Sequence, residues 1–149
     1  MGNRCGRKNG APGLELARPA LRSAGDAVAA IRMSTGGDDQ ESIVVLVCDD
    51  ENRILLAVDF AGAPATRVCD VAELVLAAMD EEPVVIVGLI RPQDSGVFTN
   101  AEVEAIEELA ALCLLSEVCL RDVIVVTGDR WRSAAEVVTE RFGENNGNQ

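Results

Sequence analysis

The chain has 149 residues, 48% of them hydrophobic, and it carries a formal net charge of −12 with no histidine. This length suits one domain with a single core, and the acidic balance excludes sequence-independent binding to nucleic acid or to an anionic membrane, since both require a concentrated cationic surface. Without imidazole, Ser-His and Cys-His nucleophiles lose their base and zinc sites lose their commonest ligand.

The first 41 residues are predicted to precede the main domain. Residues 1–13 are rich in glycine, asparagine and basic residues with little to bury, which indicates a flexible basic arm. Apolar positions near helical spacing predict a helix over 19–33, docked loosely or mobile. The Thr-Gly-Gly-Asp-Asp run at 35–39 then predicts a polar linker.

The main domain is predicted to span residues 42–142 and to begin with a hairpin. The branched apolar run at 43–48 is typical of a strand that is buried on both faces. An acidic turn at 49–52 follows, and the apolar segment 53–60 is predicted to return as the second strand.

The middle of the domain is predicted to contain a short strand at 66–69 and then a helix at 71–79. Asp70 stands where its carboxylate can cap that helix. The most apolar run of the chain, 84–90, is predicted to be a central strand.

The next helix is predicted from a capping box. Thr99 is followed three residues later by Glu102, and an apolar periodicity continues to about Ser116. A buried strand is then expected at 122–127.

A last short helix at 134–142 and a disordered tail at 143–149 complete the prediction. Strands and helices alternate through much of the chain, so the fold class is α/β, a sandwich with a mixed β-sheet flanked by helices.

The cysteines are Cys5, Cys48, Cys69, Cys113 and Cys119, and they show no Cys-x-x-Cys spacing. We expect them to be buried free thiols in a reducing cytosol. No apolar stretch is long enough to cross a membrane, and the start lacks a hydrophobic signal core, so a cytoplasmic protein is expected. The single lysine and the abundant alanine and valine are typical of a high-GC bacterial genome.

Several spacings resemble the JAB/MPN domain of the bacterial RadC-like group, a branch of the JAMM metalloprotease superfamily. In that family a central strand ends in His-x-His-Pro, and a Ser and an Asp follow at fixed distances. Here the strand ends in Leu89-Ile90-Arg91-Pro92, and Thr99 and Glu102 stand at the Ser and Asp positions without a gap.

A second strand carries the same resemblance, which covers about residues 43–136. The family's Leu-x-Asp-His-Ile motif matches residues 120–124, with valine in place of histidine, and residues 128–133 resemble the hairpin that follows it. Asp59 lies near the position of the family's catalytic Glu after a one-residue gap.

The resemblance implies a JAB/MPN-like (cytidine-deaminase-like) fold, and it implies a metal site whose ligands are missing here. In active members two histidines and the Asp hold zinc, and the Glu deprotonates a zinc-bound water. Leu89 has no lone pair to donate and Arg91 is a permanent cation, so we expect no metal and no cofactor. Arg91 is expected to pair with Glu102 or Asp94 instead.

These features predict a catalytically inactive RadC-like JAB domain that acts as a protein-interaction or scaffold module. Its expected partner is another protein or a second copy of itself, and neither nucleic acid nor membrane. The alternative is a metal-dependent hydrolase with a relocated or oxygen-only site, in which Asp59, Glu102 and Asp122 hold magnesium or manganese. Such an enzyme would melt at a higher temperature with the metal, whereas a binding module would not.

Overall fold

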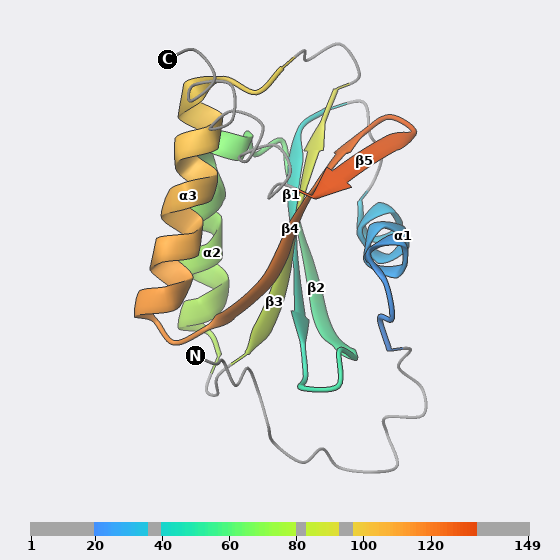
Figure 1. The fold of residues 1–149 in the computed structure, drawn as a ribbon, viewed down its shortest axis with the longest axis vertical. Helices are drawn as coiled ribbons and strands as arrows, with labels where there is room; N and C mark the ends of the chain where they lie inside the picture. The colour runs from blue at the N-terminus through green and yellow to red at the C-terminus, as the bar shows by residue number, and fades with distance from the viewer. Residues whose placement is uncertain (1–19, 36–39, 80–82, 93–96, 134–149) are drawn as a thin grey trace, which may run out of the picture.

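The computed structural model describes residues 20–35, 40–79, 83–92 and 97–133. Helices cover both faces of one sheet within these residues, one helix on the first face and two on the second (Figure 1). In chain order the elements are α1 (Ala24–Ser34), β1 (Ser42–Cys48), β2 (Ile54–Ala61), the 3-10 helix η2 (Ala65–Arg67), α2 (Val68–Ala77), β3 (Val84–Arg91), α3 (Asn100–Leu115), β4 (Cys119–Thr127) and β5 (Arg130–Ser133). The predicted α/β fold with a mixed sheet between helices is therefore confirmed.

The sheet has five strands in the order β2-β1-β3-β4-β5. Only β3 and β4 run parallel, because α3 connects them as a crossover, and the other neighbours are antiparallel. All residues of β1 and β3 are buried, as their continuous apolar composition predicted. The four longer predicted strands are confirmed, and β4 begins at Cys119, earlier than expected.

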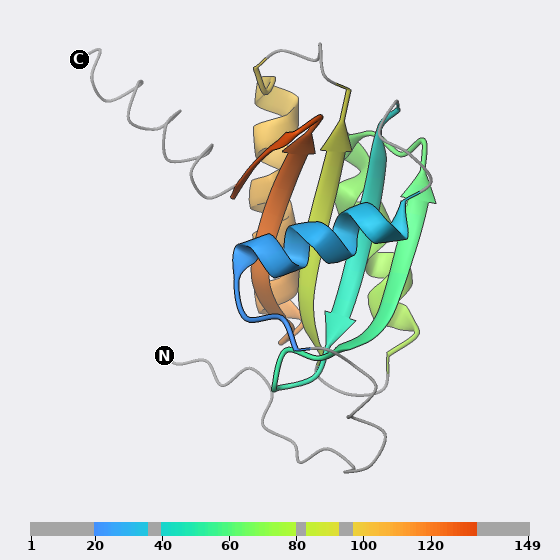
Figure 2. The ribbon, with the colours of Figure 1, turned by 90° about the vertical axis from the view of Figure 1, so that its right-hand side faces the viewer.

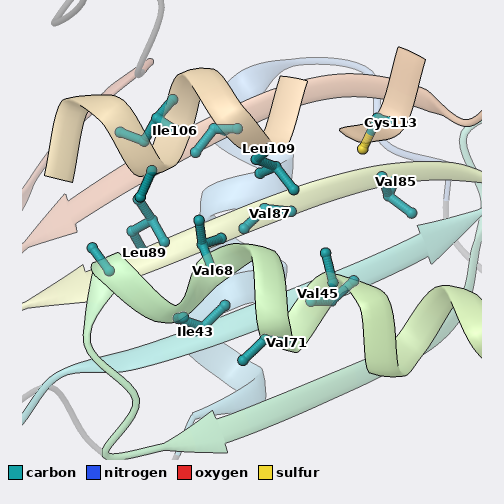
Figure 3. Close-up of a cluster of buried hydrophobic side chains, with 14 of the residues drawn as sticks. Ile43, Val45, Val68, Val71, Val85, Val87, Leu89, Ile106, Leu109 and Cys113 are labelled. Atoms are coloured by element: carbon teal, nitrogen blue, oxygen red, sulfur yellow. The ribbon is translucent and has the colours of Figure 1, made fainter. Parts of the chain in front are cut away.

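Each face of the sheet has its own hydrophobic core. Alternate residues of β1 and β3, such as Val45 and Leu89, pack against α2 and α3 (Figure 3). The residues between them, such as Val44 and Ile90, pack against α1. Because side chains alternate along a strand, the odd-numbered residues of β1 and β3 belong to one core and the even-numbered residues to the other.

Helix α1 lies across the strands on its face of the sheet (Figure 2). It begins at Ala24 instead of Pro19, because the Ser23 hydroxyl caps it by accepting the Asp26 N–H at 3.2 Å. The expectation of loose docking is wrong, since Ile31 is completely buried against the sheet. The apolar stripe of this helix is part of the second core.

The predicted short strand at 66–69 is also wrong. The chain forms η2 there and enters α2 at Val68, so Asp70 lies in the first turn of the helix and is not its cap. Its carboxylate accepts the Arg67 Nε–H at 2.8 Å. The physical reason is that Val68, Val71 and Val75 share one helical face, which extends the apolar stripe of the predicted helix upstream.

Several predicted segments lie outside the described residues: the arm at 1–13, most of the linker, the helix at 134–142 and the tail at 143–149. The division of the chain at residues 41 and 142 therefore stays a prediction. Among the described helices, none combines the length and the apolar character needed to cross a bilayer. The cytoplasmic location stays a prediction too.

Candidate functional site

The family positions at the end of β3 face α2 and α3. Leu89 belongs to the core on that side and is 1% exposed, lying among Ile43, Val68 and Ile106 (Figure 3). Arg91, two residues further along the same strand, faces the same side. The strand therefore directs one aliphatic side chain and one guanidinium to the place where the resemblance puts two zinc-binding histidines.

Arg91 forms a buried ion pair with Glu102 at the start of α3. Its Nη2 lies 3.2 Å from Oε1 and 3.5 Å from Oε2 of Glu102, and the two residues are only 5% and 9% exposed. The Phe98 ring lies beneath the guanidinium, with its centroid 4.3 Å from Cζ, which adds a cation–π contact. The predicted pairing with Glu102 is confirmed, and Asp94 lies outside the described residues.

Glu102 has a second partner because it also closes the capping box of α3. The Thr99 N–H donates to Glu102 Oε1 at 2.9 Å, and the Glu102 N–H donates to Thr99 Oγ1 at 3.1 Å. This confirms the capping box predicted from the spacing of the two residues. One carboxylate thus accepts hydrogen bonds from both a helix N-terminus and a buried guanidinium, which holds α3 against the end of β3.

Asp59 lies on the opposite face of the sheet from these residues. It stands across from Val44, whose side chain packs against α1. Its Oδ1 is buried and has no hydrogen-bond partner within the described part of the chain. The structure therefore does not bring Asp59 together with Leu89, Arg91, Thr99 and Glu102.

Phe60, the residue after Asp59 on β2, lies on the same face of the sheet as Leu89. It stands across from Ile43, and Ile43 in turn stands across from Leu89, so the three form one row on the face of α2 and α3. Sequence reasoning did not single out Phe60. The alternation of side chains along β2 would have indicated Phe60, since only an even-numbered residue of that strand shares a face with Leu89.

Asp122 also lies away from Glu102. It is paired with Ile86, which packs on the α1 side, and its Oδ1 accepts the Ser133 hydroxyl and the Val123 N–H, each at 2.8 Å. The oxygen-only trio of Asp59, Glu102 and Asp122 is thus divided between two faces of the sheet. These contacts give Asp122 a structural role, because its carboxylate links β4 to Ser133 of β5.

The donor set does not fit the zinc that the family resemblance implies. Leu89 offers no lone pair, and the permanent positive charge of Arg91 opposes a cation at this place. Within the described residues, no three of the metal-binding side chain types His, Cys, Asp and Glu are grouped closely enough to hold a metal ion. No catalytic step through a metal can be derived from these side chains.

Three of the described cysteines pack among hydrophobic groups and are not arranged as a reactive site. Cys48, Cys69 and Cys113 are free thiols, as predicted. Burial raises the pKa of Cys48 and of Cys113 to about 11, and burial likewise raises the pKa of Cys69, so all three are neutral near pH 7. The prediction of a free thiol is wrong for Cys119, which is disulfide-bonded.

Comparison with known protein families agrees with this architecture. The model of the RadC-like JAB domain matches residues 21–139, well over half of the chain, and the match includes α1. A search of curated proteins gave no match. With this match and the α/β sheet flanked by helices, the chain belongs to the family of RadC-like JAB domains.

Proposed function

We propose that this RadC-like JAB domain is catalytically inactive and works as a protein-interaction module. The observation that carries the proposal is the buried ion pair between Arg91 and Glu102. A JAMM-type hydrolase needs a cation that polarises water at this position. Here a side-chain cation neutralises the Glu102 carboxylate, and it can neither bind water as a metal does nor lower the pKa of water.

The surroundings of the pair support the same interpretation. Leu89, the nearest residue of β3 on the same face as Arg91, is part of the main core, and Phe60 lies in the same apolar row on β2. A guanidinium that has lost its partner inside a protein is costly, so a buried Arg91 and Glu102 stabilise each other only while both are present. The arrangement is therefore suited to holding α3 in place, a structural task.

An interaction role is supported by apolar side chains on the surface. Leu74 is 66% exposed on α2, while Leu114 and Leu115 are 79% and 84% exposed at the end of α3. Exposed apolar groups of this size frequently mark sites of protein association. The net charge of −12 favours a protein partner over nucleic acid.

The proposal is tested by metal binding, measured by native mass spectrometry and by thermal melting with zinc, magnesium and manganese. The wild-type protein should show no stoichiometric metal and no rise in melting temperature. The variant Leu89→His with Arg91→His removes the guanidinium and provides two imidazoles beside Glu102, so it should bind one zinc ion per chain. Its matched control is Leu89→Gln with Arg91→Gln, which has similar polarity but poor zinc ligands.

The outcomes separate the two candidate functions. A wild-type protein that is stabilised by magnesium or manganese, with the shift lost in Glu102→Ala, would overturn the inactive module in favour of the hydrolase. A folded double-histidine variant that takes up no more zinc than its glutamine control would show that Leu89 and Arg91 are not the former ligand positions.

A further inference from the structure

Strand β2 is an unusually open edge of the sheet. Its eight residues include one charged side chain, Asp59, and neither lysine nor proline, and Leu55 and Leu56 are 45% and 43% exposed. Natural proteins usually protect an edge by charges, prolines, bulges or short length, because a free edge pairs with other strands. Two such devices are present on β2: a bulge at Leu55, which leaves the stretch from Leu56 to Ala61 regular, and the charge of Asp59, which lies on the face of α1.

The backbone groups that this edge offers can be identified from its pairing with β1. The Gly62 N–H donates to the Glu41 carbonyl at 2.8 Å, flanking the pair of Ser42 and Ala61, so the N–H and C=O of Ala61 point away from β1. The direction alternates along an antiparallel strand, so the groups of Asp59 and Ala57 also point outward. No other strand among the described residues lies beyond this stretch, since the isolated bridge of Ala20 is to Arg53.

We propose that β2 pairs with β2 of a second copy, antiparallel, about a two-fold axis at Val58. Two-fold pairing about an axis perpendicular to the sheet keeps each face of one sheet continuous with the same face of the other. Centring the axis on Asp59 would place two carboxylates directly opposite, and centring it on Ala57 would extend the pairing into the bulge at Leu55. Centring it on Val58 places Ala57 opposite Asp59 of the second copy in two hydrogen-bonded pairs.

The side chains of β2 that face α2 fit together across the junction in this register. Leu56 comes to stand opposite Phe60 of the second copy, and Val58 opposite its own equivalent, which makes one apolar row across the junction. On α2, Cys69 contacts Ala105 of α3, and Leu76 is one helical repeat further on the same flank. Leu74 therefore lies on the other flank of α2, away from α3, and is 66% exposed.

The apolar row of Leu56, Val58 and Phe60 favours a second copy as the occupant of the edge, because the same row on the other copy completes it. The stretch of β2 is self-complementary: it carries one carboxylate, and the Val58 register keeps the two carboxylates of a dimer out of opposite positions. Each copy has a net charge of −12, so the copies repel at low ionic strength and should associate more tightly as salt is raised. This inference deepens the proposed interaction module and rests on it for its biological meaning.

The first test is sedimentation of the full chain over a range of concentrations at low and high salt. The wild type should dimerise, with tighter association at high salt. Leu56→Lys should weaken dimerisation by about tenfold or more, because it brings a charge into the apolar row. Its control, Leu115→Lys, changes a more exposed leucine on α3 and should leave dimerisation unchanged. A monomeric wild type, or a dimer lost in the control and kept in Leu56→Lys, would overturn the proposal.

The second test does not depend on the folding of Leu56→Lys. Residues opposite each other in a non-hydrogen-bonded pair have Cα atoms about 4.5 Å apart, within the range of a disulfide. Val58→Cys should therefore form a covalent dimer under mild oxidation, whereas the matched Ala57→Cys, which is opposite Asp59, should not. Equal cross-linking of both variants, or of neither, would refute the register. The metal-binding experiments test separately whether the domain is catalytically inactive. The proposed function and the proposed dimer can therefore fail independently.

Discussion

Gly88 on β3 lies directly beneath Ile31 of α1. A Cβ atom placed on Gly88 would come within 2.7 to 2.9 Å of three side-chain atoms of Ile31, closer than carbon atoms approach each other in proteins. Ile31 is completely buried in the core on this face, so a shift of its side chain would disturb the packing of that core. The missing side chain at Gly88 is therefore what allows α1 to pack closely against the centre of the sheet.

Gly88→Ala should lower the free energy of unfolding by about 1 to 3 kcal/mol, because α1 must move away from the sheet. Urea denaturation followed by circular dichroism measures this loss. The matched control is Gly25→Ala on the exposed side of α1, where the nearest atom to a new Cβ is Ser23 Oγ at 3.6 Å. The control should be neutral or stabilising by up to about 1 kcal/mol, since alanine is the better helix former.

A double variant tests whether the contact itself is responsible. Ile31→Ala should be destabilising alone, but Gly88→Ala should cost much less in that background, because the clash is gone. Equal costs of Gly88→Ala in both backgrounds would contradict the packing described.

The ion pair of Arg91 and Glu102 should behave as a unit. Arg91→Met should lower the free energy of unfolding by about 3 kcal/mol, because it leaves the buried Glu102 carboxylate without its guanidinium. Adding Glu102→Gln should restore part of this loss, since an amide oxygen can still accept the Thr99 N–H. Equilibrium unfolding of the three variants gives the coupling energy, and strictly additive losses would show that the two residues do not depend on each other.

The capping box should contribute measurably to α3. Thr99→Ala should cost about 1 kcal/mol of stability, because the Glu102 N–H at the start of the helix loses its acceptor. Thr99→Ser keeps a hydroxyl at the same position and should retain most of the stability. If the alanine and serine variants unfold at the same urea concentration, the hydroxyl is not the cap.

Alkaline pH should destabilise the fold through its buried thiols. Burial raises the pKa of Cys48 and Cys113 from 9.0 to about 11, so the unfolded chain loses these protons first as pH rises. Their contribution to stability is complete below pH 9 and is lost between about pH 9 and 11, by up to about 2 kcal/mol per thiol. Urea denaturation at pH 8 and pH 10.5 measures the loss, and Cys48→Ala with Cys113→Ala should show a flatter profile. An equally steep profile in that variant would assign the loss to other groups.

Local patterns in the sequence predicted most of the elements. The branched apolar runs of β1 and β3 indicated buried strands, and both strands are buried throughout. The pair of Thr99 and Glu102 indicated a helix start, because a capping box needs only residues three apart and no distant contact. The short strand predicted at 66–69 failed because four residues are too few to distinguish the two periodicities, and burial on one helical face decided between them.

The sequence by itself determined that this end of β3 is unsuited to zinc, because the chemistry of Leu89 and Arg91 does not depend on the fold. Only the tertiary structure decided which carboxylates share a site. It paired Glu102 with Arg91 and placed Asp59 on the other face, where Phe60 and not Asp59 is in line with Leu89. The physical reason is that a shift of one residue along a strand moves a side chain to the opposite face of the sheet. The register of a strand is set by its pairing with strands that are distant in the sequence.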